Sequence, residues 1–504
     1  MPIIDKAAQL SGFILYLQIN NFPTKTSICI SLVLATIFFC SCSSGTEHTG
    51  AGEATDQLTI PSTSRFDSTL PKGKVKDSIV CHDHPEESYA LYLPSYYSIA
   101  KKFPCIYFFD AHARGALPIC SYQSLAEKYG FVLIGANTSK NGTQWSATSA
   151  LVKVLMEDTR GRINIDAQRI YTSGFSGGSR VACTIAITDG GIAGVIGCGA
   201  GFPVGEQGLQ SKFDYFGIVG DHDFNLAEME KWDITLQQNG FSHQLLITSG
   251  MHGWASPADF ETALLWMQVN AIKGNRQKKN DTLVSALKRD YSKGIATLKA
   301  SGEWIKMQKL LSGMVSILDG ITDVTEQKKQ LAELGAGNEY KNAIAQQAKL
   351  QQEELNGQQE MAKQFTTQDV NWWANKIATL NESIRNGKSK QESQMNGRLL
   401  AYLGFVAYMN CSAALKTADM EQAAKYLKVF KMADPKNPDH SYLSALYYLQ
   451  KGSTKEAIAS LNEATALGFN DVVQLLAEPA FSSLKNGADF QKVVAKAKEN
   501  CCPK

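Results

Sequence analysis

Gly174-Phe175-Ser176-Gly177-Gly178 lies between a run typical of a strand, residues 169–173, and a run typical of a helix, residues 179–187. A G-x-S-x-G in this setting indicates a sharp strand-to-helix turn that lifts a serine hydroxyl above the edge of a sheet. Small residues flank the serine because its backbone is strained and because strand and helix pass close together. We therefore predict that Ser176 is a nucleophile and that the N–H of Gly177 stabilises an oxyanion, with a purely structural turn as the alternative.

Two further strand-like runs, residues 213–219 and 243–248, each lead into a candidate partner for this serine. A serine hydroxyl needs a histidine to accept its proton and a carboxylate to orient that histidine. His252 follows the second run, and we predict it as the general base. Asp221 and Asp223 both follow the first run, and their spacing of two residues does not decide which one is the acid.

Residues 88–268 resemble the esterase branch of the α/β-hydrolases, which includes polyhydroxybutyrate depolymerases and feruloyl and acetylxylan esterases. The lead-in Asn-Ile-Asp-x-x-Arg-Ile-Tyr at residues 164–171 and the His-x-Trp at residues 252–254 match that family. In the family the acid ends a Gly-x-x-Asp turn after the seventh strand, which implies Asp223 and leaves Asp221 as the alternative. The resemblance implies cleavage of carboxylic esters through an acyl-enzyme, with acylated polysaccharide as one candidate substrate. We expect no metal and no other cofactor.

The loop after the strand-like run 105–109 is expected to supply the second oxyanion donor. Relatives usually carry His-Gly-Gly here, whereas this chain has His112 followed by Ala113 and Arg114. A backbone N–H donates whatever its side chain, so we predict Ala113 as the donor, with Arg114 as the alternative, and His112 as a residue that shapes the loop. Trp145 and Trp254 are candidates for walls of the substrate pocket or for ordinary packing.

The strand-like runs at residues 88–94, 105–109 and 131–135 alternate with helical stretches. This order predicts a mostly parallel α/β-hydrolase sheet with helices on both faces and a site at the carboxyl ends of its strands. From Gly274 onward the strand signals stop, which predicts an all-α region. Within it, residues 343–364 carry a thin apolar stripe interrupted at Asn356-Gly357, and we expect an exposed helical hairpin there, with a coiled-coil partner site as the alternative.

A repeat of 34 residues is visible near the C-terminus, where Ala423 recurs as Ala457 and Leu427 as Leu461. This is the length of a tetratricopeptide repeat. The match resembles that repeat imperfectly, since Cys411 stands where alanine is usual, and covers about two repeats. We predict a tetratricopeptide-like α-solenoid that binds a protein partner.

The N-terminus resembles a bacterial lipoprotein signal. Residues 27–39 are apolar and follow Lys25, a run shorter than the roughly 20 residues that span a bilayer and typical of a secretory segment. Ser41 is the small residue expected before a lipidated cysteine, which makes Cys42 the predicted lipidation site. We expect an exported protein held to the membrane of the bacterial cell envelope by lipid. An uncleaved anchor, or a start codon placed too far upstream of Thr24, is the alternative.

The chain is thus expected to contain five segments: a signal at 1–41, a tether at 42–63, a hydrolase domain at 64–273, a helical linker at 274–395 and a tetratricopeptide-like domain at 396–500. A fragment of residues 64–273 is expected to cleave small esters alone. A net charge of +2 gives no electrostatic basis for nucleic-acid binding. A serine peptidase of the same fold, and a non-catalytic interaction lipoprotein, remain alternatives to the esterase.

Overall fold

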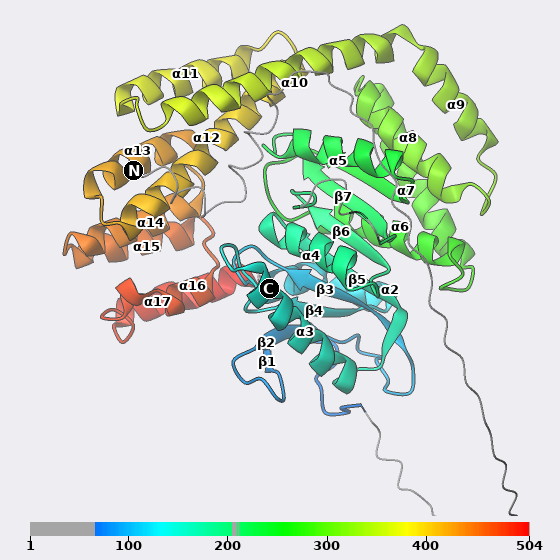
Figure 1. Ribbon diagram of the computed structural model, residues 1–504, viewed down its shortest axis with the longest axis horizontal. Coiled ribbons are helices and arrows are strands. Elements are labelled where there is room, and N and C mark those ends of the chain that lie inside the picture. The colour runs from blue at the N-terminus through cyan, green and yellow to red at the C-terminus, as the bar shows by residue number, and fades with distance from the viewer. Residues whose placement is uncertain (1–65, 204–208, 210, 503–504) are drawn as a thin grey trace, which may run out of the picture. The chain divides into compact units, whose positions relative to one another are not determined.

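The computed structural model describes residues 66–203, 209 and 211–502 (Figure 1). All of them belong to one compact unit, Phe66–Lys504. The apolar run 27–39, Cys42 and the tether lie outside the described residues, so the lipoprotein signal stays a prediction.

In the described part of the chain the strands form a sheet in the order β1-β2-β4-β3-β5-β6-β7-β8. Strand β2 pairs antiparallel with β1 and β4, and the remaining pairs are parallel. The strands are β1 (Lys76–Val80), β2 (Ser88–Tyr92), β3 (Phe103–Phe109), β4 (Val132–Ala136), β5 (Ile165–Phe175), β6 (Gly194–Cys198), β7 (Asp214–Gly220) and β8 (His243–Thr248).

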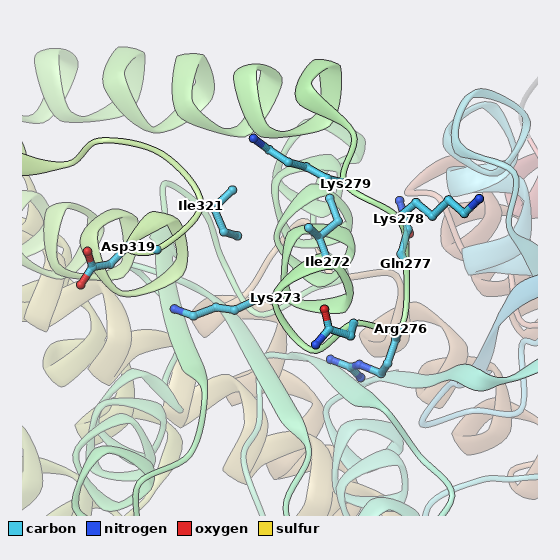
Figure 2. Close-up of a pocket in the computed structure, with 10 residues that line it drawn as sticks. Ile272, Lys273, Arg276, Gln277, Lys278, Lys279, Asp319 and Ile321 are labelled. Atoms are coloured by element: carbon cyan, nitrogen blue, oxygen red, sulfur yellow. The ribbon is translucent and has the colours of Figure 1, made fainter.

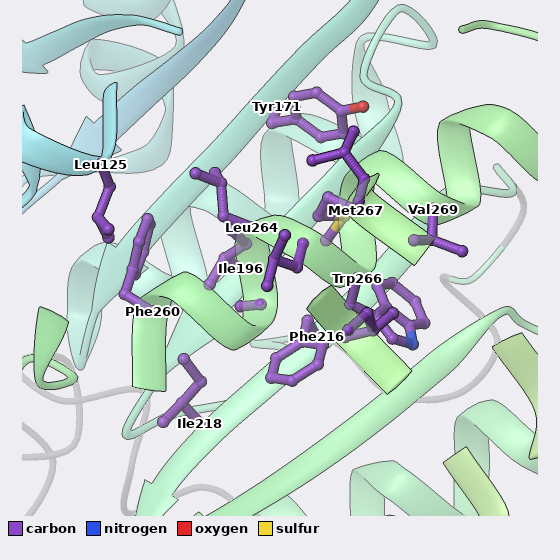
Figure 3. Packing of buried hydrophobic residues seen from close by; sticks show 14 of the residues in the cluster. Leu125, Tyr171, Ile196, Phe216, Ile218, Phe260, Leu264, Trp266, Met267 and Val269 are labelled. Carbon is purple, nitrogen blue, oxygen red and sulfur yellow. The ribbon is translucent and has the colours of Figure 1, made fainter. Parts of the chain in front are cut away.

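Both faces of the sheet are covered by helices, which explains why β3 is apolar along its whole length. Ile106 and Phe108 point to a core shared with α2 (Ala116–Tyr129) and α6 (Pro257–Lys273), part of which Figure 3 shows. Tyr107 and Phe109 point to the other core, which α3 (Trp145–Arg162), α4 (Gly177–Thr188) and α5 (Leu226–Gln238) complete. These layers confirm the predicted mostly parallel α/β-hydrolase sheet.

The rest of the described chain is helical, as predicted. Its elements are α7 (Asp281–Ala300), α8 (Trp304–Leu318), α9 (Thr325–Ala336), α10 (Asn338–Gln364), α11 (Val370–Asn386), α12 (Lys390–Lys416), α13 (Met420–Ala433), α14 (Pro438–Gln450), α15 (Thr454–Ala466), α16 (Val472–Ala477), the 3₁₀ turn η3 (Pro479–Phe481) and α17 (Ala488–Cys501). Helices α7 and α8 share the core of α2 and α6, whereas α10 to α17 enclose a core of their own.

Residues 343–364 do not form the expected hairpin, because α10 is one helix that continues through Asn356 and Gly357. The glycine lies against α12, where an added Cβ would come within 3.0 Å of the Leu399 side chain. Glu354, one turn earlier, is buried and paired with Arg398 of α12. Gly357 therefore serves close helix packing and not a turn.

Helices α13 and α15 begin 34 residues apart, at Met420 and Thr454, and Ala423 and Ala457 are both fully buried. The likeness to tetratricopeptide repeats stays a prediction. Helix α12 is long and apolar enough to cross a membrane by length and composition alone. It packs against α10, α11 and α13, and this packing accounts for its apolar residues.

The cysteines divide into a cross-link and buried thiols. Cys120 of α2 forms a disulfide with Cys502, a pairing that the sequence did not indicate. Cys105, Cys183 and Cys198 are free and buried, and burial raises the pKa of the Cys198 thiol to about 12. Such thiols are inert at neutral pH.

Candidate active site

Ser176 occupies the turn between β5 and α4 with φ 54° and ψ −119°, a backbone conformation that non-glycine residues rarely adopt. The glycines around it permit the close approach of three backbones. A Cβ on Gly174 would lie 2.2 Å from the carbonyl of Gly178, and a Cβ on Gly178 would lie 1.9 Å from the carbonyl oxygen of Phe109. This packing holds the serine in its strained conformation.

The three predicted partners meet at the carboxyl edge of the sheet. The Oγ atom of Ser176 lies 3.0 Å from Nε2 of His252, and Nδ1 of His252 lies 2.8 Å from Oδ2 of Asp223. A carboxylate only accepts hydrogen bonds, so the proton of a neutral imidazole is assigned to Nδ1 and Nε2 is free to accept from the serine. Such an arrangement can act chemically as a nucleophile, a base and an orienting acid.

Asp223 is 1% exposed and is fixed from both sides. Its Oδ1 accepts from the N–H of Asn225 at 2.8 Å, while Oδ2 meets the histidine. Gly199, at the end of β6, lies beside this contact with φ +65°, and an added Cβ would come within 3.0 Å of Asp223 Oδ2 and 3.1 Å of His252 Nδ1. Gly199 was not predicted, because β6 itself was not predicted.

Asp221, the alternative acid, points away from the histidine ring. Its carboxylate binds His222, Lys306 and Gln394, two of which belong to the helical region. In this structure the carboxylate that meets His252 is therefore that of Asp223.

The amide of Gly177 lies in the first turn of α4, where helix amides have no partner within the helix. The side chain of Asn141 lies against Gly177, since a Cβ there would come within 1.7 Å of Asn141 Oδ1. Ala113 has φ 62°, and its N–H donates to the carbonyl of Asp110 at 3.3 Å. Because that amide already has a partner within the turn, Ala113 as second oxyanion donor stays a prediction.

Asp110 connects the loop after β3 with the loop that carries His252. Its carboxylate accepts from the N–H of His112 at 2.9 Å, from Arg114 Nε at 2.7 Å and from Trp254 Nε1 at 2.8 Å. Trp254 therefore has a positioning contact, whereas Trp145 begins α3 and is 39% exposed. Asp110 was not predicted, although a buried acid at the end of an apolar strand could have indicated it.

The helical region also reaches the rim of the site. His112 Nδ1 lies 3.5 Å from Oδ2 of Asp471, and Arg114 donates to Asn470 at 2.9 Å. Phe224 packs on the His252 ring and stacks on Phe405 of α12, with ring centroids 4.5 Å and 5.1 Å apart, respectively. None of these contacts was predicted, since they join residues far apart in the chain.

A groove of about 680 Å³ lies elsewhere, between the end of α6 and the turn after α8 (Figure 2). Arg276 in its wall binds Asp214 at the start of β7, which places the groove at the amino edge of the sheet, opposite the triad. Among the described residues no group of three or more His, Cys, Asp or Glu is arranged to hold a metal.

No protein-family model matches the chain, and no curated protein is significantly similar to it. The S-formylglutathione hydrolase of Staphylococcus aureus matches in structure at 12% identity over 39% of this chain and 98% of its own, with a TM-score of 0.33. A ferulic acid esterase matches at 16% identity over 38% and 94%, with a TM-score of 0.31. Esterase B of Lactobacillus rhamnosis matches at 12% identity over 40% and 88%, with a TM-score of 0.33.

Proposed function

We propose that this protein is a serine hydrolase that cleaves carboxylic esters through an acyl-enzyme. The observation that carries the proposal is the position of His252, within hydrogen-bond distance of both Ser176 Oγ and the buried Asp223. A fold that served only as a scaffold would have no need of a strained serine, an ordered imidazole and a desolvated carboxylate in line. This geometry favours catalysis over the non-catalytic alternative.

In the proposed reaction Ser176 Oγ attacks the ester carbonyl carbon while its proton passes to Nε2 of His252. Asp223 stabilises the imidazolium that forms, and the N–H of Gly177 donates to the oxyanion. The tetrahedral intermediate then expels the alcohol, which takes the proton from His252. Water, deprotonated by the same nitrogen, releases the acid from the acyl-enzyme and restores Ser176.

We further propose that the ester substrate is an acylated carbohydrate. This narrower proposal rests on the family resemblance of residues 88–268. A peptidase of the same fold would use the same triad, so scissile-bond preference has to be measured. A lipoprotein-type signal at residues 1–41, followed by lipidation of Cys42, would place the activity in the bacterial cell envelope.

The test is labelling and turnover on full-length protein. We expect a fluorophosphonate probe to label the wild type and not Ser176→Ala, with Ser249→Ala, an exposed serine in the histidine loop, labelled like wild type. A panel of p-nitrophenyl esters, acetylated sugars and aminoacyl amides ranks the substrate classes. Asp223→Asn should lower kcat by roughly 10³–10⁴-fold, and Asp221→Asn far less. Persistent labelling of Ser176→Ala would remove the proposed nucleophile.

A further inference from the structure

Asp221 is a buried carboxylate next to the triad that the proposed chemistry does not use. Its side chain is 5% exposed, and both oxygens are occupied. Oδ1 accepts from His222 Nδ1 at 2.9 Å and from the N–H of Gly250 at 3.2 Å. Oδ2 accepts from Lys306 Nζ at 2.9 Å and from Gln394 Nε2 at 2.8 Å. One carboxylate therefore joins the acid loop, the histidine loop and two helices.

The two catalytic loops are tied to each other at the same point. The N–H of His222 donates to the carbonyl of Gly250 at 2.9 Å, and the N–H of Asp221 donates to the carbonyl of Thr248 at 2.8 Å. The loops approach so closely that a Cβ on Gly220 would lie 2.2 Å from the carbonyl oxygen of Gly250. A displacement at Asp221 is therefore a displacement at Gly250, two residues before His252.

The helical region holds the main chain of this loop as well as its side chain. Arg398 Nη1 of α12 donates to the carbonyl of Asp221 at 2.8 Å. The same guanidinium is fixed by Glu354 of α10 through contacts of 2.6 Å and 2.9 Å. Both side chains are at most 10% exposed. A charged pair so deeply buried is costly to break, so the loop has a rigid support.

The charges around Asp221 favour its ionised form. Burial alone would raise the pKa of this carboxyl, but the hydrogen bond from His222 and the positive charge of Lys306 outweigh burial and hold the pKa well below its ordinary value. The carboxylate thus stays charged and bound to Lys306 at every pH at which a histidine base works.

We propose that Asp221 is a positioning residue that couples the triad to the helices after Gly274. Through their contacts with Asp221, the side chains of Lys306, Gln394 and Arg398 hold the loops of Asp223 and His252 in place. The proposal rests on the proposed function and adds to it that the helical region sets the geometry of Asp223 and His252. Small displacements of such groups cost rate without loss of fold.

The test compares two lysines on one face of α8. Lys306 binds Asp221, and Lys309, one turn later, binds Asp233 of α5 at 2.5 Å with a similar exposure of 18% against 16%. On full-length protein we expect Lys306→Met to lower kcat for p-nitrophenyl acetate and the fluorophosphonate labelling rate on the order of 10-fold, with KM little changed. Lys309→Met should stay within about 2-fold of wild type, and Lys306→Arg should recover part of the loss.

Two further measurements separate positioning from loss of stability. Lys306→Met should have little additional effect in an Asp221→Asn background, because the interaction is already gone. Hydrogen–deuterium exchange should quicken in peptides 220–225 and 249–253 of Lys306→Met and not of Lys309→Met. If Lys306→Met does not fold, Gln394→Leu, which removes a neutral contact to the same carboxylate, replaces it.

Equal rates for wild type, Lys306→Met and Lys309→Met would overturn the proposal, and so would equal losses in both variants. Additive effects of Lys306→Met and Asp221→Asn would also overturn it. An unlabelled wild type would instead refute the proposed function, while the exchange comparison would still report whether Lys306 orders the two loops.

Discussion

A chain that ends at Lys273 should fail to fold, although the sequence signals alone place a domain boundary at residue 274. Helix α6 is buried almost all round, with the sheet on one side and α7 and α8 on the other. Its large apolar residues are Phe260, Leu264, Leu265, Trp266, Met267, Val269 and Ile272. Removing everything beyond α6 leaves its outer side in water.

The size of this loss can be estimated from burial. Exposing three or four large apolar side chains costs about 5–12 kcal/mol at about 1.5–3 kcal/mol each. A domain of this size is stable by about 5–15 kcal/mol in total. The truncation also removes Lys306, the partner of Asp221, and Cys502, the partner of Cys120. The fragment is therefore expected to lack a cooperative fold.

The measurement is thermal and urea unfolding followed by circular dichroism, with ester hydrolysis assayed on the same samples. A matched fragment that ends at Asp319 keeps α7 and α8 and should unfold cooperatively, but it should cleave p-nitrophenyl acetate more slowly than the full chain because α12 is missing. A fragment ending at Lys273 that melts cooperatively and turns over at the full-length rate would refute this reasoning.

Three further outcomes are expected. Gly199→Ala should lower kcat on the order of 10²-fold in a folded protein, because its Cβ would come within 3.0 Å of the acid's carboxylate at a φ of +65°; unchanged kinetics would contradict this. Cys120→Ser opens a cross-link to Cys502 across 382 residues and should cost about 2–5 kcal/mol of unfolding free energy, with dithiothreitol lowering the Tm of wild type alone. Burial lowers the pKa of His112, but its contact with Asp471 outweighs burial and raises the pKa. This contact therefore stabilises the fold fully below about pH 6.5, the ordinary pKa of histidine, and its stabilisation is lost as pH rises through the raised pKa. His112→Gln should have a lower Tm than wild type at pH 5.5, and this difference in Tm should be smaller at pH 9. An equal difference in Tm at both pH values would contradict the raised pKa.

The fold of the part that contains the sheet could be predicted because its signals are local. Strand β8 spans the predicted residues 243–248, and the elbow at Ser176 was visible from five consecutive residues. The order of serine, acid and histidine followed from loops that come directly after strands. Strand β6 was missed because Gly194–Cys198 is short and contains two glycines, which lower strand propensity.

What the sequence could not indicate are contacts between distant segments. The bond from Arg398 to Asp221 joins residues 177 apart, and the pairing of Cys120 with Cys502 joins residues 382 apart. Gly357 was interpreted as an interruption because a single sequence does not show that Leu399 packs against it. The packing role of such a glycine becomes visible only when both helices are placed in the fold.

The two aspartates of the acid loop show how one turn serves two regions. Residues two apart on an extended strand would share a face, but in a turn they diverge, so Asp223 faces His252 while Asp221 faces α8 and α12. A displacement of the main chain at Asp221 also displaces Asp223, because both belong to the same four-residue turn after β7. The repeat pattern predicts that the helical region binds a partner. If that binding shifts α12 by a fraction of an ångström, we expect the displacement to be transmitted to Asp223 through Asp221. We therefore expect turnover of even a small soluble ester, which touches no partner, to depend on the state of the helical region.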